Sequence, residues 1–178
     1  MASTETKAGN LPITLATYIY LLDDSGRHPQ DSVLQLACNA LRDAPADKAD
    51  ELGAVLVAQV TDALGGRDAS FDKVVRYLKR LFGDAHVATD MGGTREDRFA
   101  AARRYEFQMG MPWLAQIVDR FPDGAVGAHW VMVERTTDTV RCMDPYPWDD
   151  VDEEYEAPVV EFAVKWELAG ANAVRWVS

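Results

Sequence analysis

The chain has 178 residues, of which 48% are apolar and 26% are charged, and its formal net charge is -11. This composition excludes intrinsic disorder and low-complexity fibres, and the length predicts one compact domain over 1–178, with a flexible tail at 1–9. So large a negative charge also disfavours nucleic acid and anionic membrane surfaces as partners.

The two cysteines, Cys38 and Cys142, are too few for a disulfide framework or a four-thiolate zinc site, and they favour a reducing compartment. The first residues lack the apolar core of a signal peptide, and no apolar run approaches the roughly 18 residues of a spanning helix. We therefore expect a cytoplasmic protein with neither a cofactor nor a bound metal. Its oligomeric state is left open.

Apolar residues recur at helical spacing through the first part of the chain, and turn or capping residues separate the segments. Asp31 and Ser70 are typical N-caps, and Gly65 and Gly83 are typical helix ends. Thr94 with Asp97 resembles a capping box. The predicted helices are 12–22, 31–43, 47–64, 70–82 and 95–107.

After Gly110 the pattern changes to short apolar runs that are broken by turn residues. These runs predict strands at 112–118, 128–134 and 139–144, then a helix at 158–168 and a last strand at 172–177. Helices first and antiparallel strands later indicate an α+β fold, in which N-terminal helices pack on a C-terminal antiparallel sheet.

The hairpin 128–147 holds two polar residues on an otherwise apolar face. A four-residue loop at 135–138 would pair Glu134 with Thr139, Val131 with Cys142, and His129 with Asp144. An imidazole beside a carboxylate has its tautomer and orientation fixed, as catalytic His–Asp pairs require. The same pair can also be purely structural and hold two strands in register.

The wider pattern resembles the papain-like peptidases of the C39-like kind, from Ser70 to the end of the chain. In that family a G-x-P strand precedes a strand that opens with the catalytic His, and the following strand ends in Asp-Pro. The matching segments here are Gly110-Met111-Pro112, Gly127-Ala128-His129 and Asp144-Pro145. The resemblance implies a papain-like fold with His129 as general base and Asp144 as its orienting partner.

The nucleophile of this family is the point at which the sequence departs from the pattern. The resemblance places a Cys-Gly pair at the start of the first helix, where Asn10 and Leu11 stand here. An asparagine cannot form a thiolate. Cys38 is a tentative replacement, although its place on the apolar stripe of a helix is typical of a core residue, and the same holds for Cys142 within a strand.

Aromatic residues close to His129 could line a groove for a peptide or could pack as a lid on the core. They are Trp130, Tyr146, Trp148 and Tyr155. The run 149–156 holds six carboxylates and is most simply a solvated acidic loop rather than a cation site. His28 and His86 are isolated from Cys and from one another in sequence, so a zinc site is not expected. The arginines of 95–104 indicate intramolecular charge balance.

Three functions follow from these observations. The first is a papain-like protein that has lost its nucleophile and binds a peptide or protein in the former active-site groove. The second is an active cysteine hydrolase or acyltransferase that uses a Cys with His129 and Asp144. The third is an acidic interaction protein of the immunity or adaptor type, in which the hairpin is structural. The missing Cys-Gly favours the first.

Overall fold

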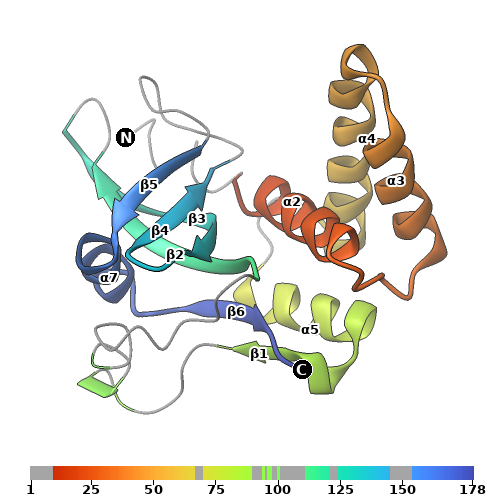
Figure 1. Cartoon of the computed structure of the whole chain (residues 1–178). Helices are drawn as coiled ribbons and strands as arrows, with labels where there is room; N and C mark the ends of the chain where they lie inside the picture. Colours follow the sequence, from red (N-terminus) through yellow and green to blue (C-terminus); the bar gives the residue numbers. More distant parts are fainter. Residues whose placement is uncertain are drawn as a thin grey trace.

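The computed structural model describes residues 10–66, 70–89, 94, 96–97, 100, 111–120, 124–144 and 154–178. Within these residues the fold is α+β, as predicted, with five α-helices and one antiparallel sheet (Figure 1). The helices are α2 (Asn10–Asp24), α3 (Ser32–Asp43), α4 (Ala46–Leu64), α5 (Phe71–Phe82) and α7 (Val159–Leu168). None of the helices in the described ranges is long and apolar enough to cross a membrane.

The capping residues explain where the helices begin and end. Asp31 accepts hydrogen bonds from the backbone N–H groups of Val33 and Leu34, and Ser70 accepts one from Lys73, so both predicted N-caps are confirmed. Gly65 follows α4 with a φ of 78°, the left-handed conformation that glycine adopts at no steric cost.

The helix predicted at 95–107 lies largely outside the described residues. At its start, Thr94 and Asp97 exchange the hydrogen bonds of a capping box, because the backbone N–H of each donates to the side chain of the other at 3.1 Å.

The sheet has six strands in the order β1-β6-β2-β3-β4-β5. Four of them correspond to predicted segments: β2 (Trp113–Arg120), β3 (Val126–Arg135), β4 (Thr139–Met143) and β6 (Ala173–Trp176). The edge strands β1 (Val87–Thr89) and β5 (Glu154–Pro158) are additional. The interpretation of 149–156 as an acidic loop is therefore wrong from Glu154 onward, because pairing with β4 orders these residues as a strand.

The sheet is covered on both faces, which explains the continuous apolar run from Trp130 to Val133 in β3. Leu114, Trp130 and Met132 face the core that the N-terminal helices form. Their neighbours Trp113, Val131 and Val133 face the second core, under α7. The alternation along each strand thus divides one apolar run between two cores.

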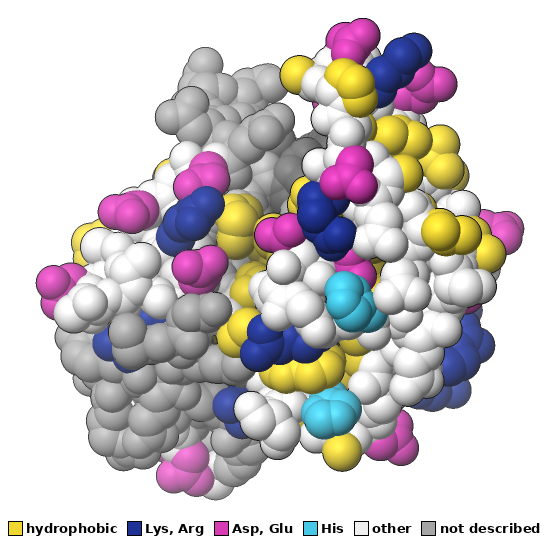
Figure 2. All heavy atoms as spheres, turned by 45° about the vertical axis from the view of Figure 1, so that its right-hand side comes forward, with side chains coloured by type: hydrophobic (Ala, Val, Ile, Leu, Met, Phe, Trp, Pro, Cys, Tyr) yellow, Lys and Arg dark blue, Asp and Glu magenta, His cyan; other side chains and the backbone are white. Residues whose placement is uncertain are grey.

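The N-terminal helices take different positions relative to the sheet. Helix α2 packs on β2 and β3, and α5 packs on β1. Helices α3 and α4 pack on each other and on α2, and Figure 1 shows this pair standing beside the sheet. Apolar side chains remain exposed on the pair, among them Val33, Leu36 and Val55 (Figure 2).

The Asp31 cap gives a test of this helical half. We expect Asp31→Ala to lower the free energy of unfolding by about 1 kcal/mol, because two backbone N–H groups lose their acceptor. Asp43, in the last turn of the same helix, is the matched control. Asp43→Ala should leave stability equal or slightly higher, since a carboxylate at a helix C-terminus is unfavourable. Urea denaturation measures both, and equal losses would contradict the capping role.

Candidate functional site

The site consists of a buried histidine and a buried aspartate on neighbouring strands. His129 lies in β3 and is 2% exposed, and Asp144 directly follows β4 and is 3% exposed. Nε2 of His129 is 2.9 Å from Oδ2 of Asp144. A carboxylate oxygen accepts from the imidazole N–H, so this hydrogen bond places a proton on Nε2 and directs Nδ1 away from Asp144. The predicted juxtaposition of these two side chains is therefore present.

The register that produces this contact differs from the predicted one by two residues. Val133 pairs with Cys142 and Glu134 with Arg141, so the predicted pairs Val131–Cys142 and Glu134–Thr139 are wrong. The reason is a tighter hairpin, in which the side-chain hydroxyls of Thr136 and Thr139 are 2.7 Å apart. A shift of two residues keeps every side chain on its face, so His129 contacts Asp144 diagonally.

The second turn of α2 contacts the strand that carries His129. The helix begins at Asn10, and the hydroxyl of Thr14, one turn later, donates to the backbone carbonyl of Trp130 at 3.2 Å. Trp130 is the residue after His129 in β3. Figure 1 shows the start of α2 toward the sheet and its other end toward α3. The helix start and the histidine strand are thus joined by a buried side-chain contact.

Neither cysteine lies in an environment that favours a thiolate. Cys38 is fully buried in the core of the N-terminal helices, where burial first and then Asp23 raise its pKa to about 12. Cys142 belongs to the other core, on the sheet face of His129, and burial raises its pKa to about 12 as well. The sheet therefore separates Cys38 from the side chain of His129, which lies on the opposite face.

Two of the predicted substrate-binding aromatics are described, and both pack against the protein. The ring of Trp130 stacks on Phe71 at the start of α5, with ring centroids 5.0 Å apart, on the sheet face opposite His129. Tyr155 lies opposite Cys142 in the β4–β5 ladder and packs against the core under α7. Tyr146 and Trp148 lie outside the described residues.

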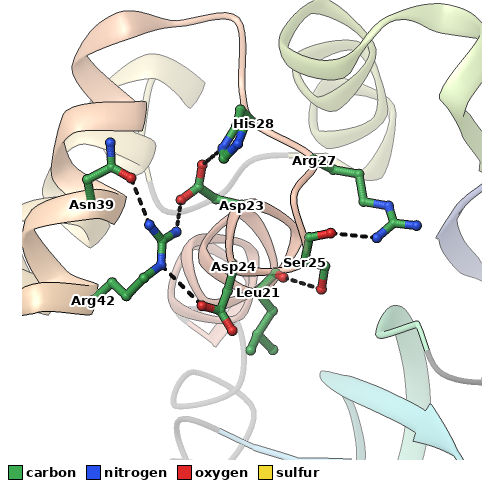
Figure 3. Close-up of polar contacts among 8 residues, drawn as sticks. All are labelled: Leu21, Asp23, Asp24, Ser25, Arg27, His28, Asn39 and Arg42. Carbon is green, nitrogen blue, oxygen red and sulfur yellow. Dashed lines mark hydrogen bonds and ion pairs between the residues drawn. The ribbon is translucent and has the colours of Figure 1, made fainter.

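A second polar cluster, which the sequence analysis missed, joins the end of α2 to α3 (Figure 3). The carboxylate of Asp23 is fully buried, and it contacts Nδ1 of His28 at 2.6 Å and the guanidinium of Arg42. Arg42 also donates to Asp24 at 3.1 Å and to Asn39 at 2.8 Å. Partners on both oxygens compensate the burial of this charge, so the cluster holds two helices together.

The remaining sequence candidates have structural partners or are not described. His86 stacks on Trp176 with ring centroids 4.8 Å apart, and its Nδ1 is 3.2 Å from the carbonyl of Val177. In the described part of the chain no three His, Cys, Asp or Glu side chains are grouped as metal ligands. The arginines of 95–104 and the carboxylates of 149–153 are outside the described residues.

The row of cationic side chains on α5 is a feature that the sequence signals. In α5 the solvent-facing positions at helical spacing are almost all cationic, in an otherwise acidic chain. Asp23 gave no such signal, because an aspartate at the end of a predicted helix is ordinarily exposed.

Comparison with known proteins assigns neither a family nor an activity to the chain. No protein-family model and no curated protein sequence matches it. Among solved structures, it is similar to the one described as the crystal structure of the Pseudomonas avirulence protein AvrPphB. The two share 11% sequence identity with a TM-score of 0.44, over 96% of this chain and 93% of that chain.

The buried pair gives a testable energetic prediction. Asp144→Ala should lower the free energy of unfolding by about 2 kcal/mol, because it leaves the Nε2–H of His129 buried without this acceptor. Asp144→Asn should cost less, since its amide oxygen can accept the same hydrogen bond. Asp50→Ala, on the exposed side of α4, is the control and should change stability by less than about 0.5 kcal/mol. Equal stability of all three variants in urea would contradict a stabilising role for the hydrogen bond between His129 and Asp144.

Proposed function

We propose that this chain is a non-catalytic domain of papain-like type, which binds a peptide or protein where the start of α2 meets the strand that carries His129. One observation carries this proposal: a hydrogen bond orients His129 and Asp144, but neither cysteine of the chain ionises readily. The pair has the arrangement that covalent catalysis uses, but the nucleophile that would make it productive is missing.

The position of α2 supports Asn10 as the residue in the place of that nucleophile. Four residues of helix rise about 6 Å, so Asn10 begins α2 one turn before the Thr14 contact with β3. The resemblance of the sequence to papain-like peptidases places a cysteine at this point. An asparagine there both donates and accepts hydrogen bonds, which suits non-covalent contact with a peptide backbone.

The thiol environments argue against an active cysteine enzyme. A thiol with a pKa near 12 is ionised in only about one molecule in ten thousand at pH 8, and less at lower pH. Catalytic cysteines instead have pKa values lowered by a histidine or a helix N-terminus. Cys38 and Cys142 therefore have the properties of core residues.

The burial of His129 favours a second candidate, an acidic interaction protein in which the hairpin is purely structural. A side chain that is 2% exposed gives a partner little area to contact. Both candidates are non-catalytic, and they differ in where the partner lies. In the first it lies at the start of α2, and in the second it lies on another surface.

Thiol labelling tests the absence of cysteine chemistry. We expect iodoacetamide to leave both cysteines of the folded protein unmodified at about pH 5.5, because both thiols are buried and neutral. Intact-mass spectrometry measures the adducts, and the guanidinium-unfolded chain, which should gain two, is the control. Rapid labelling of one cysteine at this pH, lost in His129→Ala, would instead make the chain a cysteine enzyme.

A cysteine placed at the start of α2 tests the position of Asn10. We expect the thiol introduced by Asn10→Cys to react at about pH 5.5, because the helix N-terminus lowers a thiol pKa and the proposed site requires His129 to lie within reach of this thiol. Adding His129→Ala should slow this reaction. Ala46→Cys is the matched control, since Ala46 is exposed at the first position of α4 and has only the helix effect.

The same variant locates the partner. Peptides selected from a display library against the wild-type chain should protect the Asn10→Cys thiol from iodoacetamide. A labelling rate independent of His129 would place Asn10 away from the pair and contradict the proposed site. Normal His129-dependent labelling that the selected peptides do not slow would move the partner to another surface, as the second candidate requires.

A further inference from the structure

Helix α5 presents a row of positive charge to solvent. Its buried positions face the core, and the exposed side carries Lys73, Arg76, Lys79 and Arg80 against the single carboxylate Asp72. The helix therefore has a formal charge of +3 within a chain of net charge -11. Twelve residues of helix span about 18 Å, so this charge is concentrated on a short, straight surface.

These four cations have no carboxylate partner among the described residues. Of the other described cations, Arg27 and Arg175 also have none, whereas four are paired. Arg42, Lys48, Arg141 and Lys165 each contact at least one carboxylate. In α5 the contact of Arg80 is with the ring of Tyr77, 5.4 Å from the ring centroid. No ion pair of the α5 cations is found in the part of the chain that the structure describes.

Two open hollows flank Arg76, one on each side of the helix. The first, of about 560 Å³, is lined by Phe71, Val75, Arg76 and Lys79 together with Asp72 and Thr89. The second, of about 430 Å³, lies between α5 and the end of α4, and Lys73, Arg76, Tyr77 and Arg80 line it with Leu64 and Asp62. Each hollow thus combines apolar side chains with at least two cations.

The partial negative charge of the helix C-termini balances only part of the positive charge on α5. Lys79 and Arg80 lie in the last turn of α5, where cations stabilise the C-terminal carbonyls, and the end of α4 faces the second hollow. A helix terminus carries only about half an elementary charge. Together with Asp62 and Asp72, the two termini leave a net positive surface.

We propose that the exposed face of α5 binds an acidic segment of a partner protein, with carboxylates at the cations beside Arg76 and apolar side chains in the two hollows. The charge of the surface fits carboxylates, and its apolar lining fits amino-acid side chains rather than a phosphate backbone. The net charge of -11 repels long polyanions, whereas a short segment meets only the local charge within a Debye length of about 8 Å. This inference does not depend on the site beside His129.

Fluorescence anisotropy with a labelled peptide that alternates glutamate and leucine tests the proposal. We expect the full-length protein to bind this peptide at about 50 mM salt, and to bind it more weakly as salt rises. Arg76→Glu should weaken binding about tenfold or more, because Arg76 lines both hollows. Lys73→Glu, which changes the second hollow alone, should have a smaller effect in the same direction.

Lys48→Glu is the matched control, because Lys48 is another exposed helical lysine and the substitution changes the net charge equally. It should alter the affinity by less than about twofold. Circular dichroism verifies that each variant is folded. The proposal is overturned if the wild type does not bind the peptide, if Arg76→Glu and Lys48→Glu act alike, or if a DNA duplex binds the α5 face more tightly than the peptide.

Discussion

The antiparallel pairing of β2 with β3 is the constraint on which the rest of the structure depends. Eight consecutive residue pairs join the two strands, from Trp113–Val133 to Arg120–Val126, at the centre of the sheet. Because side chains alternate, this ladder sends one row to the core of the N-terminal helices and the other to the core under α7. A shift of one residue would exchange the two rows, so the sizes and shapes of the side chains that each core accommodates specify the register.

The properties of the candidate site follow from this sheet. His129 is paired with Ile117 in the ladder, and its neighbour Trp130 is held on the opposite face by Thr14 and Phe71. The imidazole therefore cannot turn without moving a strand that is packed on both sides. The same covering buries Cys38 in one core and Cys142 in the other. The packing that surrounds the histidine also buries both thiols, and this burial raises their pKa.

Local sequence signals were enough to predict the described helices and the side chains that share a face of the hairpin. They were not enough for features that depend on contacts between distant parts of the chain. Asp31 and Ser70 bond within their own helices, so their role is visible in sequence. The meeting of His129 with Asp144 was predictable because strand alternation survives a register error of two. The short strands β1 and β5 depend on pairing with β6 and β4, which no local pattern encodes. The burial of Asp23 likewise depends on Arg42, 19 residues away.

The distribution of charge divides the described surface into regions where cations are paired with carboxylates and one helix where they are not. Arg141 and Lys165 contact carboxylates, so their charge is balanced within the fold. A balanced pair at the surface contributes little to stability or to attraction at a distance. The α5 cations keep their charge available, and they lie on a helix whose other side anchors it in the core through Leu78 and Phe82. A rigid helix that displays unbalanced charge needs no reordering to meet a partner, so little conformational entropy is lost on binding. The charge pattern, rather than the His–Asp pair, is then the feature by which an acidic protein such as this one can select an acidic segment at short range.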